Sequence, residues 1–485
     1  MMQYDNDAKQ MKYEVLKLVA KYTFEGTLNE HLEDIPYDII PGPQPSYRCC
    51  VYREREIIRE RLSSAQGKNL PGQEDSGIVG VLPAACEGCP ISRFTVTDNC
   101  QKCLAKKCQA ACPFGAISIT GRGAYIDPNK CKECGRCAAA CPYNAISDTM
   151  RPCMRACPVG AISKDEYSRA VIDYSKCISC GACVAGCPFG AITDRSSIVD
   201  VINAIRNGEK VIATFAPAIE GHFGMANVGM LKSAIRKLGF QDVIEVSLGA
   251  DATAWHEAQE LKEAVENNQK MTTSCCPAFV EMIEKHFPRL IPNISHTGSP
   301  MTLVSRYIRA NYEGAKVVFI GPCIAKKLEV KRVEDTADYA ITFEELAAMF
   351  DAQGINVMDP AEKEQDGSRP GKNFAQSGGV AAAVSRVLDE EGFEKPFSAV
   401  KCNGAKECKK FLMIMNAGKL PETILEGMAC EGGCVAGPGG VETLQKLLKM
   451  RTKLLAEADN RGITENVNSL HDFSGISMTA HRKQL

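Results

Sequence analysis

The chain has 485 residues and a formal net charge of -2, with 45% hydrophobic and 24% charged residues. This length is too great for one core and predicts about three domains, while the near-neutral charge gives no sign of a nucleic-acid or membrane-surface partner. We find no run of about 18 apolar residues and no secretory leader, so the sequence predicts a cytoplasmic protein without membrane insertion.

Residues 1–80 are predicted to form a small, mainly helical N-terminal region. Apolar residues recur at helical spacing from Met11 to Tyr22, which predicts an amphipathic helix. A second helix, from Tyr52 to Leu62, is so rich in Glu and Arg that most of its charges are expected to face solvent. Residues 65–80 contain many Gly, Gln and Ser residues and indicate a linker.

Sixteen of the 25 cysteines lie between Cys86 and Cys187. The runs Cys131–Pro142 and Cys177–Pro188 both follow C-x2-C-x2-C-x3-C-P, the spacing with which bacterial ferredoxins bind 4Fe–4S clusters. Disulfides would need an oxidising compartment, and clustered C-x2-C pairs in a long chain favour metal instead. Since the phrase Cys-Pro-x-x-Ala-Ile occurs four times, we predict two tandem α+β ferredoxin-like units in residues 81–195.

In bacterial ferredoxins, three cysteines of one run and the fourth of the other run bind each cluster. This rule predicts four 4Fe–4S clusters, with the ligand sets Cys100, Cys103, Cys108 and Cys141; Cys131, Cys134, Cys137 and Cys112; Cys177, Cys180, Cys183 and Cys157; and Cys86, Cys89, Cys153 and Cys187. Two sets are irregular. The interval from Cys103 to Cys108 is longer than usual, and Cys86 and Cys89 join the last set because no other partner remains for them.

Residues 196–450 alternate strand-like runs, such as Val211–Phe215 and Lys316–Ile320, with helical patterns. This alternation predicts an α/β domain. Residues 451–485 are predicted to contain the end of a helix and a polar tail that is poorly ordered after Asn460.

Three further cysteine motifs lie in the α/β domain, and none has ferredoxin spacing. They read Thr-Ser-Cys275-Cys276-Pro, Gly321-Pro-Cys323-Ile-Ala-Lys326 and Met428-Ala-Cys430-Glu-Gly-Gly-Cys434. In order and separation they resemble the three signature motifs of the FeFe-hydrogenases, and the resemblance covers residues 81–450. It implies a hydrogenase that interconverts protons, electrons and H2, with a ferredoxin-like electron carrier and hydrogenase maturation proteins as partners.

The resemblance also implies the cofactor, called the H-cluster, around which the α/β domain is built. A 4Fe–4S cubane would be held by Cys276, Cys323, Cys430 and Cys434. Cys434 would also bridge to a two-iron subsite that carries CO, cyanide and a dithiolate amine. Lys326 would hydrogen-bond a cyanide ligand, and further cofactor contacts are expected from Pro217, Gly321 and Met428.

A proton path is implied as well, through Cys275, Glu257, Ser295 and Glu260. A thiol suits the innermost position because it can donate and accept a proton and has a pKa nearer neutral than a hydroxyl. Glu257 and Glu260 are three residues apart and share one face of a predicted helix.

The sequence departs from the usual motifs of this family at several pocket positions. Ala218 and Met301 replace residues that have polar side chains, and Gly321 replaces a methionine, which predicts altered redox tuning. Two other functions stay open: a hydrogen-sensing regulator of low turnover, and an iron–sulfur assembly factor without the two-iron subsite. Cys402 and Cys408 are predicted to be buried or reactive thiols.

Overall fold

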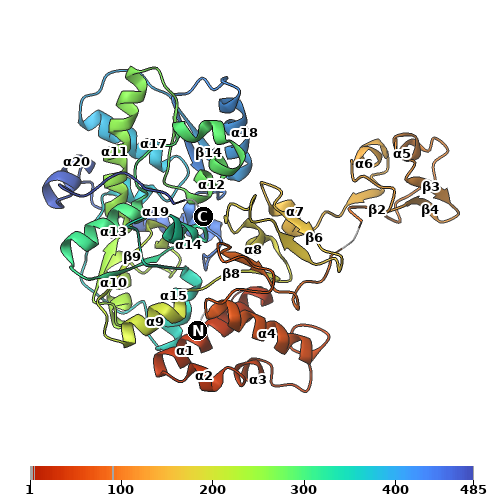
Figure 1. Cartoon of the computed structure of the whole chain (residues 1–485), viewed down its shortest axis with the longest axis horizontal. Helices are drawn as coiled ribbons and strands as arrows, with labels where there is room; N and C mark the ends of the chain where they lie inside the picture. The colour runs from red at the N-terminus through yellow and green to blue at the C-terminus, as the bar shows by residue number, and fades with distance from the viewer. Residues whose placement is uncertain (1–3, 5, 90–91, 484–485) are drawn as a thin grey trace.

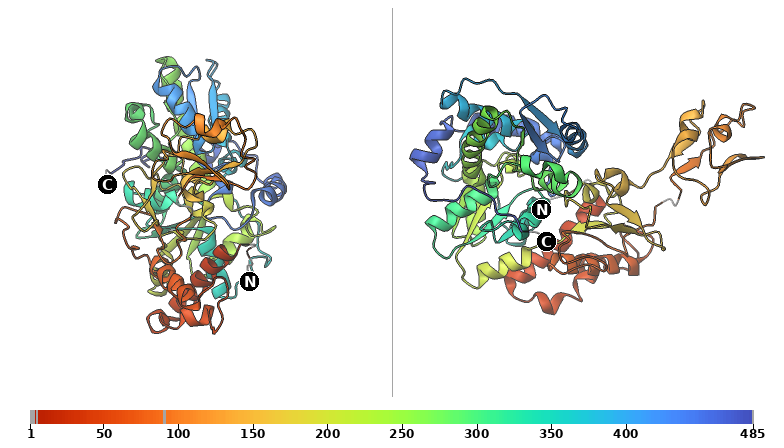
Figure 2. Two further views of the ribbon diagram at one scale, coloured as in Figure 1. Left: turned by 90° about the vertical axis from the view of Figure 1, so that its right-hand side faces the viewer. Right: turned by 45° about the horizontal axis from the view of Figure 1, so that its top comes forward.

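The computed structural model describes residues 4, 6–89 and 92–483. It shows a main body that contains the N-terminal helices and two parallel sheets, with one small unit projecting from its side (Figure 1). The right-hand view in Figure 2 shows the same separation from another direction. The projecting unit runs from β2 (Phe94–Val96) to β5 (Ile146–Asp148).

The N-terminal region is helical and packs on the α/β domain. It comprises α1 (Asp7–Glu25), α2 (Leu28–His31), α3 (Ile35–Ile39) and α4 (Val51–Ala65). The charges of α4 are less solvated than predicted. Glu54 is completely buried and accepts a hydrogen bond from the backbone N–H of Ser46 at 2.8 Å. Arg61 is also buried and donates to the Gly190 carbonyl at 2.6 Å, which attaches this helix to the iron–sulfur region.

Two ferredoxin-like units follow, and each is closed by the same pairing of strands. The first contains β2, α5 (Lys107–Ala110), β3 (Ile117–Thr120), β4 (Gly123–Ile126), α6 (Arg136–Ala140) and β5. The second contains β1 (Val79–Val81), α7 (Pro152–Ala156), β6 (Ile162–Lys164), β7 (Ala170–Ile172), α8 (Ala182–Gly186) and β8 (Ile192–Asp194). In each unit the outermost strands pair antiparallel, as β2 with β5 and β1 with β8, and the middle strands form a hairpin.

The predicted tandem order is wrong, because one unit is inserted into the other. We call residues 94–148 the outer unit, and residues 79–89 together with 152–194 the inner unit. The outer unit interrupts the chain between Cys89 and Cys153, while β1 still pairs with β8 across the interruption. A regular Cys-x2-Cys…Cys-x3-Cys run is thereby split, which explains why Cys86 and Cys89 stand alone in the sequence.

The α/β domain is built on two parallel sheets, as its predicted class requires. One has the order β10 (Asp242–Glu245), β9 (Val211–Phe215), β12 (Lys316–Ile320) and β13 (Tyr339–Ile341). The other has the order β11 (Met271–Thr272), β15 (Ile424–Met428) and β14 (Ala399–Asn403). β9 and β12 are apolar and almost completely buried, as is typical of parallel strands covered on both faces.

Helices cover both sheets (Figure 1). They are α9 (Ile198–Arg206), η1 (Pro217–Ile219), α10 (Val228–Lys237), α11 (Val246–Glu266), α12 (Pro277–His286), η2 (Pro288–Asn293), α13 (Pro300–Asn311), α14 (Ala325–Arg332), α15 (Phe343–Ala352), α16 (Arg369–Asn373), α17 (Gly379–Glu390), α18 (Ala405–Asn416), η3 (Cys434–Ala436), α19 (Leu444–Ala456), α20 (Ile463–Glu465) and η4 (Asn466–Leu470). Within the described part of the chain, no helix is long and apolar enough to cross a membrane.

The C-terminal tail is packed on the domain, which corrects the prediction that it is poorly ordered. Asn466 is completely buried and donates to the Asp251 carboxylate at 2.7 Å. Farther along, Thr479 forms an antiparallel bridge with Thr297 beside the first cysteine motif. The tail therefore helps to fix α11 and the loop before α13.

A buried network of charges joins all three regions. Lys12 of α1 contacts Asp194 at 2.8 Å and Glu344 at 2.7 Å, and Lys327 of α14 contacts Asp194 at 2.7 Å and Glu345 at 2.9 Å. Burial alone would raise the pKa of Asp194, but the ammonium groups of Lys12 and Lys327 lower it well below its ordinary value. The carboxylate at the end of β8 thus links the inner unit to the N-terminal helices and to the α/β domain.

The variant Asp194→Asn is expected to lower the free energy of unfolding by about 3 kcal/mol, since two buried ammonium groups lose a shared partner. Denaturant unfolding measures this loss. Lys9→Ala is the control: Lys9 is two-fifths exposed and 3.7 Å from Glu344, so its loss should cost less than about 1 kcal/mol. Because the pKa of Asp194 is lowered, its contribution is complete above pH ~4 and is lost only at lower pH. Equal losses in both variants would contradict the prediction.

Candidate metal centre

One cavity in the α/β domain is lined by segments at the carboxyl ends of strands from both sheets, where ligands of parallel α/β sheets usually bind. The segments are residues 216–218 after β9, Val246 after β10, Cys275 and Cys276 after β11, Pro322 and Cys323 after β12, and residues 428–430 after β15. The cavity has a volume of about 80 Å³, which is several times the space that one water needs. Two separate sheets thus deliver their loops to one point.

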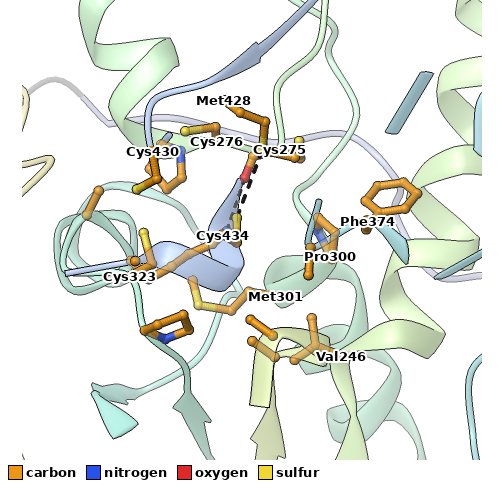
Figure 3. A pocket seen from close by; sticks show the side chains of 18 of the residues that line it. Val246, Cys275, Cys276, Pro300, Met301, Cys323, Phe374, Met428, Cys430 and Cys434 are labelled. Atoms are coloured by element: carbon orange, nitrogen blue, oxygen red, sulfur yellow. Dashed lines mark hydrogen bonds between the residues drawn. The ribbon is translucent and has the colours of Figure 1, made fainter. Parts of the chain in front are cut away.

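The four cysteines predicted to hold the cubane all line this cavity: Cys276, Cys323, Cys430 and Cys434. Figure 3 shows them gathered at one side, opposite Pro300 and Phe374. Burial raises the pKa of Cys430 well above its ordinary value, and the negative charges of the other three add to this effect. Four thiols so close together in an apolar cavity would ionise together only with a positively charged partner.

The spacing of the cysteines fits an iron–sulfur cube better than a single ion. Zn²⁺ would hold thiolates at about 2.3 Å, yet no three Cys, His, Asp or Glu side chains within the described residues are close enough to share one metal ion. All 25 cysteines lie among the described residues, and every one is a free thiol. The donor set is therefore four unpaired thiols around a space larger than one ion, which is what a cubane requires.

Lys326 lies at the wall of the cavity, where sequence reasoning placed it. It is buried, and its ammonium group donates to Ser299 at 2.8 Å and to Glu329 at 2.5 Å. Burial raises the pKa of Cys434, and the positive charge of Lys326 partly opposes this. Sequence reasoning missed Glu329, although its position three residues after Lys326 on α14 was a usable signal.

Pro217 and Met428 line the cavity as predicted, but Gly321 does not. A Cβ at Gly321 would lie 2.5 Å from the ring of Phe319, and this ring lines the cavity instead. The space that a methionine would take at position 321 is thus used by a side chain two residues earlier. The motif could not predict that Phe319 lines the cavity, because Phe319 lies in β12 among other apolar residues.

The remaining cavity wall is apolar where polar groups were expected. Ala218 and Met301 line the cavity, and both are completely buried. Neither offers a hydrogen-bond donor, so the polar contacts of this wall must come from Lys326 and from backbone N–H groups.

Four of the upstream cysteines, one in each predicted set, have members of their own set as charged neighbours. In the outer unit, burial raises the pKa of Cys108, and the charges of Cys103 and Cys141 add to the increase. In the second set of this unit, burial raises the pKa of Cys137, and the charges of Cys131 and Cys112 add to the increase. Neighbouring thiols of the inner unit are related in the same way, with Cys86, Cys89 and Cys187 near Cys153, and Cys157, Cys177 and Cys180 near Cys183.

The repeated Cys-Pro-x-x-Ala-Ile phrase has a structural reason. In all four copies the alanine N–H donates to the sulfur of the cysteine, at 3.2–3.4 Å. Such bonds stabilise a thiolate at a metal site. The repeat therefore encodes a sulfur-binding turn as well as a position in the core.

Cys180 connects the inner unit to the cavity, since it lines the same space as Cys276 and Cys430. Burial raises the pKa of Cys180 to about 12, and the charge of Cys276 contributes to the increase. One predicted cluster of the inner unit therefore lies directly beside the cysteines of the α/β domain.

The four residues of the predicted proton path lie together. Cys275 is buried at the cavity, and burial, followed by the charge of Glu257, raises its pKa well above the ordinary value. The Glu257 carboxylate accepts from the Ser274 N–H at 3.2 Å, and the neighbouring Ser295 hydroxyl partly offsets the increase in the pKa of Glu257. Glu260, whose side chain is 19% exposed, lies next to Glu257 and ends the row near the surface.

Both glutamates of this row have one buried oxygen without a hydrogen-bond partner among the described residues. Burial raises the pKa of Glu257 to about 8, and the backbone bond from Ser274 opposes this only in part. The carboxyl is therefore mainly protonated at neutral pH and can donate a proton as well as accept one.

Cys402 and Cys408 take no part in the cavity. Both are completely buried, as predicted, and Cys402 is close enough to raise the pKa of Cys408. Cys408 also donates to the Met428 carbonyl at 3.5 Å, so the pair packs behind the third cysteine motif.

Comparison with known families places these features in context. The profile of the iron only hydrogenase large subunit, C-terminal domain, matches residues 209–438. A 4Fe–4S dicluster domain matches residues 151–191, and a 4Fe–4S binding domain matches residues 124–147.

Among curated relatives, iron hydrogenase 1 of Clostridium pasteurianum is 30% identical over 307 residues, which cover 51% of this chain and 53% of that protein. The large subunit of a periplasmic iron hydrogenase from Nitratidesulfovibrio vulgaris is 31% identical over 50% of this chain and 72% of its own length. A probable cytosolic Fe–S cluster assembly factor of Caenorhabditis elegans is 26% identical over 53% of this chain and 70% of its own length. This chain thus spans about half the length of the first relative.

Among solved structures, an FeFe-hydrogenase from Chlamydomonas reinhardtii has a TM-score of 0.49 and 24% identity, over 57% of this chain and 94% of that one.

The raised pKa of Glu257 can be measured directly. Infrared difference spectra should contain a carboxylic acid C=O band at pH 7 that disappears as the pH rises through about 8. The band should be missing in Glu257→Gln and should persist in Glu263→Gln, which alters an exposed glutamate of the same helix. A spectrum unchanged by Glu257→Gln would refute the assignment.

Proposed function

Since the chain belongs to the iron-only hydrogenase family, we propose that it catalyses the reversible conversion of two protons and two electrons into H2. The observation that supports this most is the cavity in which four free cysteines, a buried lysine and a further thiol meet. A protein that only carries electrons would need neither the buried lysine, Lys326, nor the further thiol of Cys275.

In this proposal Cys276, Cys323, Cys430 and Cys434 would hold the cubane of the H-cluster, and Cys434 would also attach the two-iron subsite. When bound, the two-iron subsite supplies the chemistry that forms and cleaves the H–H bond. Lys326, held by Ser299 and Glu329, supplies a fixed positive charge to anionic ligands in the cavity. The apolar side chains of the opposite wall exclude water from the reacting centre.

Protons would move along the row that leads from Cys275 to the surface. Cys275 exchanges its proton with the Glu257 carboxyl, whose pKa of about 8 lets it act as acid or base near neutral pH. Ser295 passes the proton on through its hydroxyl, which both donates and accepts. Glu260, partly exposed, exchanges it with solvent.

Electrons would move along the predicted 4Fe–4S clusters. Cys180 lines the cavity, so the inner unit would deliver electrons to the H-cluster, while the outer unit projects from the side of the main body (Figure 1). We infer that a ferredoxin-like carrier exchanges electrons with this row, and that maturation proteins install the two-iron subsite.

A second candidate function is iron–sulfur cluster assembly, because cytosolic assembly factors are also among the relatives. Such a protein would carry cubes without a two-iron subsite. The buried row of Cys275, Glu257 and Ser295 favours hydrogenase activity, since assembly needs no proton path to the cavity.

The decisive test uses protein produced with hydrogenase maturation enzymes under strict anaerobiosis. We expect infrared bands of metal-bound CO and cyanide, together with H2-dependent reduction of methyl viologen. The absence of these bands after full maturation would favour the assembly function. Full bands without H2 turnover would contradict the proposal.

The variant Cys275→Ala should lower H2 turnover about 10²–10⁴-fold, the usual contribution of one positioned acid or base. Its iron content and its CO and cyanide bands should match those of the unaltered protein. Cys49→Ala, at an exposed thiol far from the cavity in the chain, is the matched control. Normal turnover by Cys275→Ala would show that the Cys275 thiol is not part of the proton path.

A further inference from the structure

One loop of the outer unit exposes a large apolar side chain for which the fold gives no reason. Leu104 is 97% exposed. It lies in the interval from Cys103 to Cys108, where this chain has two residues more than the regular ferredoxin spacing. Burying a leucine normally contributes about 1.5–3 kcal/mol, so a leucine that contacts nothing gains no stability from its position.

The same loop is strongly basic. Lys102, Lys106 and Lys107 surround Leu104 in the chain, and all three are exposed. Among the described residues, neither Lys106 nor Lys107 forms an ion pair, whereas elsewhere in this unit Arg93 is paired with Asp148 at 2.9 Å. Residues 92–149 contain eight Lys and Arg but only four Asp and Glu, although the whole chain has a net charge of -2.

The backbone of this basic loop has a defined shape. Lys102 and Lys106 both have left-handed backbone conformations, with φ of 52° and 42°. Lys102 donates to the Gly121 carbonyl at 2.5 Å, and the Lys106 N–H donates to the Cys103 carbonyl at 3.2 Å. A loop held in this way presents Leu104 in a defined position, which reduces the entropy lost on binding.

The position of the basic loop also matters. It joins two cysteines of one predicted cluster, Cys103 and Cys108, and it leads into α5 at the outer end of the projecting unit (Figure 1). A protein that covers Leu104 would therefore bring its own redox centre close to the most remote cluster of the row.

We propose that the basic loop, residues 101–107, is the docking site for a small acidic protein that carries one electron at a centre near its surface. The apolar side chain of Leu104 forms the central contact and the lysines form a charged rim, the usual arrangement of an interface. Electrostatic attraction between the lysines and an acidic carrier speeds their encounter. This docking site rests on the proposed hydrogenase function and names its electron partner.

The electron balance is simple. Each reduced carrier molecule loses one electron to the cluster of Cys100, Cys103, Cys108 and Cys141 and leaves in its oxidised form. Two such transfers and two protons yield one molecule of H2, and the reverse direction reduces two carrier molecules.

The test compares two electron donors in the matured full-length protein: a purified acidic 4Fe–4S ferredoxin, and methyl viologen, a dye too small to need a docking site. The double variant Lys106→Glu/Lys107→Glu should raise the KM for ferredoxin about tenfold at low salt and flatten its salt dependence. The rate with viologen should stay unchanged. The control Lys449→Glu/Lys453→Glu makes the same charge change at two exposed lysines of α19 and should change neither rate.

Leu104→Ser is the second variant, because glutamates beside Cys108 could impair cluster loading. It should raise the KM for ferredoxin without changing iron content or the rate with viologen. An unchanged ferredoxin KM in iron-replete Leu104→Ser, or an equal effect of the control, would overturn the proposal.

Binding of oxidised ferredoxin to the immobilised protein, measured by surface plasmon resonance, separates the two hypotheses. Loss of binding in the loop variants would support the docking site even if the protein had no hydrogenase activity. Binding unaffected by either variant would reject the docking site while leaving hydrogenase activity untouched.

Discussion

The structure depends on one constraint: thiols from distant parts of the chain must meet in a space without water. Cys276, Cys323 and Cys430 follow strands of two different parallel sheets. Parallel strands all end at one edge, so each sheet can bring several loops to one place. The two sheets share the cavity at these edges, and the N-terminal helices and the C-terminal tail both pack around the domain that holds it.

Low polarity in the cavity explains the groups that surround it. A carboxylate or a thiolate is costly there, so the pKa of Glu257 and the pKa of Cys275 are both raised. The single cation of the wall, Lys326, is balanced by Glu329. The acids of the predicted proton path are thus favoured in their neutral forms, while the fixed charge of Lys326 is paired.

Sequence reasoning reached the features that short-range spacing encodes. Cysteine spacing predicted which thiols lie together, and the three irregular motifs pointed to the residues that line the cavity. It failed where contacts depend on distant parts of the chain. The tandem order was wrong because only the pairing of β1 with β8 reveals the insertion, and repeated cysteine phrases read the same whether units are nested or consecutive.

The sequence also could not show where a side chain from one position fills the space beside another position. Phe319 occupies the space beside Gly321, but nothing in the sequence separates it from other apolar strand residues. Glu54 and Arg61 were expected to face solvent, yet both are buried because a neighbouring loop and the inner unit supply their partners. Composition describes a helix by itself, whereas burial depends on what packs against it.

The insertion of the outer unit has a consequence for synthesis. During translation, residues 94–148 leave the ribosome as one continuous segment that contains all its paired strands. β1, by contrast, is made before them and must wait for β8, which is made after them. Since domains generally fold as they emerge, the peripheral unit can close first, and the part nearest the cavity is completed last.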